Sequence, residues 1–146
     1  MDIDLTWLVL AGGRGTRSAN PALPKILQEI GGKSLLLHHL ETLSNDARTN
    51  VLFVLSHGSE QVIAEIQKFR ASFESLEIRF VIDEGLGPVN ALKGAVSEIT
   101  TEHTAVILGD SAIDAPLIEI SRHAVKAFSR GYRACVGLRQ SDHLFD

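Results

Sequence analysis

Near the N-terminus stands the run Trp7-Leu8-Val9-Leu10-Ala11-Gly12-Gly13-Arg14-Gly15-Thr16-Arg17, and Pro24-Lys25 follows it after a short gap. Its apolar part is typical of a buried parallel strand, and three glycines within four positions end that strand. Glycine lets the backbone approach a ligand closely because no Cβ intervenes, and successive N–H groups can then hold an anion. Arg17 offers a fork of donors and Lys25 a point charge, so the stretch predicts a polyphosphate site at the end of a strand.

A plain turn and two well-known glycine motifs fit this stretch less well. A turn that merely reverses the chain does not require the two cationic side chains of Arg17 and Lys25. The dinucleotide-binding fingerprint needs a third glycine where Ser18 stands. The run Gly32-Lys33-Ser34 imitates the end of a P-loop, but Leu27 occupies the place of the first glycine of that motif.

Composition narrows the class of protein. The chain has 146 residues, which is the length of one domain, and its hydrophobic fraction of 45% is ordinary for a globular protein. The net charge is -4 without a long basic run, which argues against nucleic acid as a partner. No apolar stretch approaches the length of a membrane span, so no membrane partner is expected.

Two features bear on location in the cell. The N-terminus, Met1-Asp2-Ile3-Asp4, is acidic and lacks the positively charged region of a secretory signal. The single cysteine, Cys135, excludes an internal disulfide and is compatible with a reducing compartment. These features predict a cytoplasmic protein.

Apolar runs alternate along the chain with segments of helical spacing. Strands are expected at 8–10, 51–55, 78–82, 105–108 and 132–138, and helices at 34–43, 59–69, 89–96 and 117–128. Ser34 is expected to cap the first helix, and Val89, Leu92 and Val96 to form an apolar face of the third. The alternation predicts an α/β fold: a three-layer, doubly wound, mostly parallel Rossmann-like sheet of about five strands, with helices on both faces.

The first stretch resembles the signature of the nucleotidyltransferases that join a nucleoside triphosphate to a sugar 1-phosphate and release pyrophosphate. That signature is roughly Leu-Ala-Gly/Ala-Gly-x-Gly-Thr-Arg, a variable loop and Pro-Lys. The resemblance implies that this chain is the nucleotide-binding part of such an enzyme, with Arg17 and Lys25 as catalytic residues. It implies that the nucleotide is bound by Leu10, Ala11, Gly12, Gly13, Gly15 and Thr16.

The segment 84–91 resembles the part of these enzymes that contacts the base and ribose, often Gln-x-Gly-Thr-x-x-Ala. Gly87 matches that form and is expected to bind nucleotide. Gly85 and Pro88 stand where the form has Gln and Thr, so base recognition is not carried over. Asn90 could bond a nucleoside, but Asn also suits the start of a helix for local reasons, and both interpretations remain open.

The pair Gly109-Asp110 ends the fourth expected strand. By itself such a pair would favour a turn or a helix cap. In the family that the chain resembles, the Asp of a Gly-Asp pair at this place binds Mg²⁺, so the resemblance implies Mg²⁺ as cofactor and Asp110 as its ligand. Asp114 is a weaker second carboxylate, and a helix cap is the preferred interpretation for it.

The resemblance extends from about Leu8 to Leu138, whereas such enzymes continue beyond a fifth strand with a sugar-phosphate pocket. We therefore expect residues 1–146 to be a single nucleotidyltransferase-like domain, truncated at its C-terminal side, as a fragment or a short version of a longer enzyme. An open edge at 132–138 is expected to permit a homodimer.

Three functions remain open from the sequence. The first is transfer of a nucleotidyl group from a nucleoside triphosphate to a sugar 1-phosphate. The second is a nucleotide-binding regulatory or non-catalytic module that retains only the triphosphate site. The third is nucleotidyl transfer to the molybdenum cofactor, which shares the glycine-rich loop.

Overall fold

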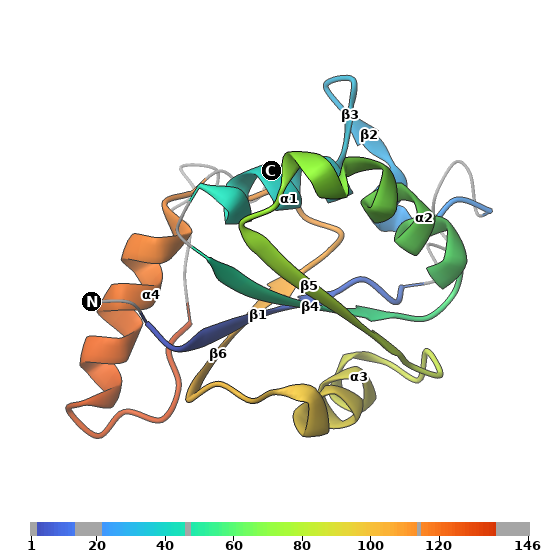
Figure 1. Cartoon of the computed structure of the whole chain (residues 1–146). Coiled ribbons are helices and arrows are strands. Elements are labelled where there is room, and N and C mark those ends of the chain that lie inside the picture. Colours follow the sequence, from blue (N-terminus) through green and yellow to red (C-terminus); the bar gives the residue numbers. More distant parts are fainter. Residues whose placement is uncertain (1–2, 14–21, 46–47, 114, 137–146) are drawn as a thin grey trace, which may run out of the picture. The chain divides into compact units, whose positions relative to one another are not determined.

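The computed structural model describes residues 3–13, 22–45, 48–113 and 115–136 (Figure 1). The chain divides into two compact units, Met1–Ala115 and Pro116–Asp146. The first unit contains the strands β1 (Leu5–Leu10), β4 (Thr49–Leu55), β5 (Leu76–Ile82) and β6 (His103–Leu108), the short hairpin strands β2 (Glu29–Ile30) and β3 (Lys33–Ser34), the α-helices α1 (Leu35–Ser44), α2 (Ser59–Phe69) and α3 (Pro88–Ala95), and the 3₁₀ turns η1 (Lys25–Leu27), η2 (Arg70–Ser72) and η3 (Val96–Glu98). The second unit contains α4 (Leu117–Phe128).

The four long strands form one parallel sheet in the order β5-β4-β1-β6. The strand β1 is central, and Leu8 lies between Leu52 on β4 and Val106 on β6. Two strands therefore extend the sheet on one side of β1, and the chain then crosses to the other side to add β6. Such a reversal of strand order places a crevice outside the carboxyl ends of β1 and β6, where open α/β sheets bind ligands.

Helices cover both faces of the sheet, with α1 and α2 on one face and α3 on the other (Figure 1). On the α3 face, Leu8, Leu52 and Val54 form a buried cluster with Ala91 and Ala95. The predicted three-layer, doubly wound parallel architecture is thus confirmed. No helix in the described part of the chain is both long and apolar enough to cross a membrane.

The start of α1 follows from a local signal in the sequence. The Ser34 hydroxyl accepts a hydrogen bond from the Leu37 amide at 3.2 Å, as predicted for an N-cap. Such a cap typically contributes about 1 kcal/mol to helix stability. The buried residues of this helix are Leu35, Leu36, His39, Leu40 and Leu43.

The apolar face predicted for the third helix is only in part the buried one. Val89 and Val96 are 63% and 65% exposed, whereas Ala91 and Ala95 are buried and Leu92 packs at the margin of the same cluster. Hydrophobicity alone favours valine over alanine for burial. The side chains of the sheet decide which face of the helix approaches, and small alanines allow that approach to be close.

The prediction of a fifth strand at 132–138 was wrong over the residues that the structure describes. Residues 132–136 form no strand, and residues 137–138 lie outside the described residues. Tyr132 and Val136 are 63% and 81% exposed. Local sequence carries only a weak intrinsic preference for a strand, which forms where a partner and a buried face are available. The described part of the proposed dimer edge is therefore not a strand.

Candidate functional site

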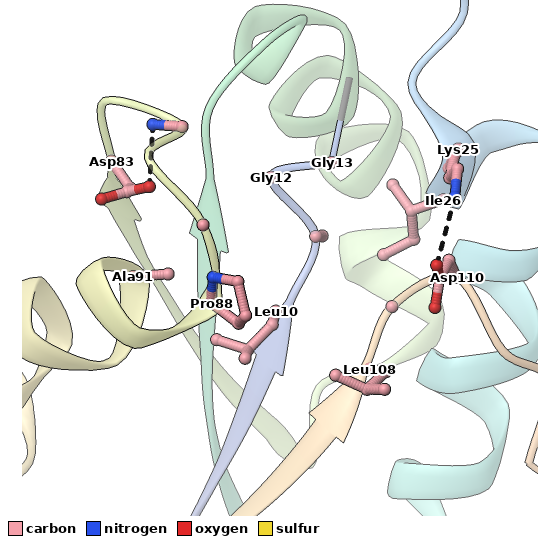
Figure 2. Close-up of a pocket in the computed structure, with 14 residues that line it drawn as sticks. Leu10, Gly12, Gly13, Lys25, Ile26, Asp83, Pro88, Ala91, Leu108 and Asp110 are labelled. Atoms are coloured by element: carbon pink, nitrogen blue, oxygen red, sulfur yellow. Dashed lines mark hydrogen bonds and ion pairs between the residues drawn. The ribbon is translucent and has the colours of Figure 1, made fainter. Parts of the chain in front are cut away.

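A pocket of about 410 Å³ opens at the carboxyl ends of β1, β5 and β6 (Figure 2). Its size falls within the range of small-molecule sites. Of the residues predicted to bind nucleotide, phosphate or metal, the structure brings seven to this pocket: Leu10, Ala11, Gly12, Gly13, Lys25, Gly87 and Asp110. These residues come from four separate segments, so the fold assembles the pocket from parts that are distant in the sequence.

For other predicted residues the structure gives a different answer or none. Gly15, Thr16, Arg17 and the weaker metal candidate Asp114 lie outside the described residues. Asn90 is described but does not line the pocket. Its side-chain amide donates to the Leu86 carbonyl at 3.3 Å, which is a local bond of the kind that a position near a helix start favours.

The glycine-rich loop continues directly from β1. The Ala11 amide donates to the Val54 carbonyl at 2.9 Å, and the Ser56 hydroxyl then donates to the Gly12 carbonyl. A Cβ added at Gly12 would lie 2.9 Å from the Ser56 hydroxyl oxygen, so a larger residue here would displace the Ser56 side chain that bonds this loop. Sequence reasoning missed Ser56, although it is the first polar residue after a continuous apolar strand.

The turn after β6 packs against the end of β1. The Gly109 amide donates to the Leu10 carbonyl at 2.8 Å. A Cβ added at Gly109 would lie 2.9 Å from that same carbonyl oxygen, so a larger residue would push the turn away. The glycine thereby brings Asp110 to the edge of the pocket beside the glycine-rich loop.

Lys25 and Asp110 face each other across this edge (Figure 2). The Lys25 ammonium nitrogen lies 3.3 Å from a carboxylate oxygen of Asp110, and the two side chains are 39% and 47% exposed. The neighbour Ile26 is 1% exposed and anchors the short turn that carries Lys25. Because exposed ion pairs contribute only about 0–1 kcal/mol, this pair can exchange its partners for ligand groups at little cost.

A second carboxylate, Asp83, lines the pocket and was not predicted. It directly follows β5, and its amide donates to the Leu55 carbonyl at 2.7 Å. Its carboxylate accepts a hydrogen bond from the Gly85 amide at 2.8 Å. Asp83 lies on the opposite side of the pocket from Asp110 (Figure 2). Its position after a strand was the signal that could have identified it.

His39 lies on α1 and is 2% exposed. Its Nε2 lies 3.4 Å from the carbonyl oxygen of Gly109. Burial lowers the pKa of His39 from its ordinary value of 6.5, against the opposing effect of this carbonyl. The imidazole is therefore neutral in the folded protein at neutral pH, and the sequence had assigned it no role.

The lowered pKa of His39 predicts a loss of stability in mild acid. Below pH 6.5 the unfolded chain takes up a proton that the folded protein resists, so the free energy of unfolding falls as the pH falls toward the folded pKa. The slope from this group is at most about 1.4 kcal/mol per pH unit. Urea denaturation at pH values of about 7.5 and 5.5 should show a smaller difference for His39→Gln than for the natural protein. Equal pH dependence in the two proteins would contradict the assignment.

Comparison with known proteins places these features in a family. The model of the MobA-like NTP transferase domain matches residues 7–143. The bifunctional protein GlmU of Pseudomonas entomophila is 33% identical over 121 residues, and that of Psychrobacter arcticus is 36% identical over 115 residues. The matches cover 82% and 78% of this chain, and the chain spans about a quarter (24%) of the length of either GlmU protein.

Solved structures share the fold. HddC from Yersinia pseudotuberculosis, complexed with GMP-PN, matches 82% of this chain and 54% of its own, with a TM-score of 0.67 and 25% identity. A UDP-glucose pyrophosphorylase complexed with UDP-glucose matches 87% of this chain and 55% of its own, with a TM-score of 0.69. At 20% identity, the second likeness establishes the fold alone.

Proposed function

The chain belongs to the MobA-like NTP transferase domain family, and from this premise we propose that it transfers a nucleoside monophosphate from a nucleoside triphosphate to a sugar 1-phosphate. The observation that carries the proposal is the convergence of Gly12 and Gly13, at the start of the glycine-rich loop, with Lys25 and Asp110 on one pocket. The solved neighbour HddC supports nucleotide chemistry, because it is complexed with GMP-PN.

The proposed reaction is an in-line displacement at the α-phosphorus. An oxygen of the acceptor phosphate forms a new bond to the α-phosphorus, and the bond from that phosphorus to the oxygen bridging the α- and β-phosphates breaks. Pyrophosphate leaves with the electron pair of the broken bond. The acceptor phosphate is already ionised at neutral pH, so the step needs no general base.

The chain's own groups serve this reaction electrostatically. Arg17 and the amides of the glycine-rich loop hold the β- and γ-phosphates and stabilise the leaving pyrophosphate. Lys25 binds the α-phosphate, where negative charge develops during the displacement. In the structure Lys25 is paired with Asp110, so binding of the substrate requires this pair to open.

Asp110 is the proposed ligand of Mg²⁺. Within the described residues no group of three or more His, Cys, Asp or Glu side chains could hold a metal. A single half-exposed carboxylate at the pocket edge nevertheless fits Mg²⁺, which usually takes one or two carboxylates and completes its shell with phosphate oxygens and water. When bound there, Mg²⁺ would neutralise part of the charge of the triphosphate.

Thermal denaturation with a panel of nucleoside triphosphates tests the proposal. A triphosphate with Mg²⁺ should raise the melting temperature, because a ligand selective for the native state stabilises it. Arg17→Ala should remove most of that rise and leave the unliganded melting temperature nearly unchanged. If Arg17→Ala unfolds the protein, Arg17 is structural and the loop proposal loses its main support.

A coupled assay for pyrophosphate release with sugar 1-phosphates separates transfer from binding. Release that depends on both substrates supports the transferase. Stabilisation by triphosphate without release of pyrophosphate from any acceptor favours the module that only binds nucleotide.

A further inference from the structure

We propose that His39 is a positioning residue that holds the Gly109-Asp110 turn and thereby sets the affinity of the site for a divalent cation. The inference rests on the proposed role of Asp110 as a metal ligand. It concerns a side chain that contacts the turn and does not line the pocket itself.

The geometry makes His39 a donor to the turn. Its side chain is 2% exposed, and Nε2 lies 3.4 Å from the Gly109 carbonyl oxygen. A carbonyl oxygen can only accept a hydrogen bond, so Nε2 must carry the proton. A buried imidazole on a packed helix has little freedom to move. The position of its N–H donor is therefore fixed, and the hydrogen bond restricts the position of the turn.

Gly109 is held from two sides. Its amide donates to the Leu10 carbonyl at 2.8 Å, and its carbonyl faces His39. The carbonyl of Gly109 and the amide and Cα of Asp110 lie in one rigid peptide plane. Holding that carbonyl therefore restricts the direction in which the Asp110 side chain leaves the backbone.

The Asp110 side chain itself has little to hold it. It is 47% exposed, its ion pair with Lys25 is one that substrate must open, and Ser111 contacts it at 3.4 Å. The backbone is thus the main source of order for this carboxylate. A second contact from the same helix holds the chain further on, where the Thr42 hydroxyl lies 3.3 Å from the Ile113 carbonyl oxygen.

Three variants test the proposal. His39→Leu removes the donor and keeps an apolar side chain in the buried position, whereas His39→Gln keeps an N–H donor at similar reach. His38→Ala is the matched control. This neighbouring histidine also forms a hydrogen bond to a backbone carbonyl, that of Ile30 at 3.0 Å, but Ile30 belongs to the hairpin outside the pocket. If His39→Leu does not fold, His39→Met replaces it.

The first measurement is amide hydrogen exchange without any ligand. We expect His39→Leu to speed exchange at residues 109–111 more than elsewhere in β1 or β6, and His39→Gln and His38→Ala to leave that turn protected. Uniformly faster exchange throughout the sheet would show a purely structural role and overturn the proposal.

The second measurement is the Mg²⁺ concentration that gives half of the thermal stabilisation by a triphosphate. We expect His39→Leu to raise it about 10-fold, the scale of effect for groups that orient metal ligands, and to leave metal-free triphosphate binding unchanged. His39→Gln should restore most of the loss. An unchanged Mg²⁺ requirement in His39→Leu would overturn the proposal.

The two measurements also distinguish this inference from the proposed function. If the natural protein binds no triphosphate, the proposed function fails. Local exchange at residues 109–111 would still show whether His39 positions the turn.

Discussion

Asp110→Asn is expected to abolish the Mg²⁺-dependent part of nucleotide binding. The substitution keeps the shape of the side chain and removes the charge that a hard divalent cation requires. We expect the Mg²⁺-dependent gain in affinity to fall by at least about 100-fold, because loss of a supporting group alone costs 10- to 100-fold at metal sites. Calorimetric titration of a triphosphate with and without Mg²⁺ measures this gain.

Binding of triphosphate without metal should not be weakened by Asp110→Asn. Asp110 pairs with Lys25 in the structure, so its neutralisation frees that ammonium for phosphate. The affinity for triphosphate in the presence of a chelator should therefore be unchanged or higher in Asp110→Asn. A loss of affinity with and without metal would mean that Asp110 supports the fold of the pocket and does not bind the ion.

Two further carboxylates serve as controls. Asp83 lines the same pocket, where the Gly85 amide occupies one of its oxygens, and Asp114 lies outside the described residues. Asp83→Asn and Asp114→Asn should each leave most of the Mg²⁺ dependence intact. An effect of either substitution equal to that of Asp110→Asn would show that Asp110 is not the ligand of the ion, or that the two carboxylates share it.

Lys25→Ala is expected to produce the second large effect, a 10- to 100-fold loss of affinity for the Mg²⁺-triphosphate. A charge-assisted hydrogen bond to phosphate contributes about 1.5–3 kcal/mol, which corresponds to this range. Where pyrophosphate release is measurable, its rate should fall further, because charge on the α-phosphate grows in the transition state. Titration calorimetry gives the affinity and a coupled pyrophosphate assay gives the rate.

Lys33→Ala is the matched control for this experiment. Lys33 also pairs with a carboxylate, that of Glu41 at 2.6 Å, but it does not line the pocket. Removing it should leave triphosphate binding unchanged, and Lys25→Arg should retain part of the affinity. Equal losses from Lys25→Ala and Lys33→Ala would point to a general effect of net charge.

The sequence by itself determined the local elements and the family. The family match confirms the resemblance that the glycine-rich run and Pro24-Lys25 suggested. The cap at Ser34 and the bounds of the helix at 117–128 were predicted and are observed. Strand runs, helix caps and glycine turns arise from interactions between near neighbours, so the sequence of a short segment is enough to indicate them.

Only the tertiary structure decided which segments meet. Lys25 and Asp110 are 85 positions apart and come together because β1 and β6 are neighbours in the sheet. The same is true of His39 and Gly109, and of the choice of Ala91 over Val89 for burial. Residues 132–136 of the expected strand at 132–138 form no strand for this reason too, because local composition does not supply a partner strand. Pairing and burial depend on residues far away along the chain, and no local pattern records them.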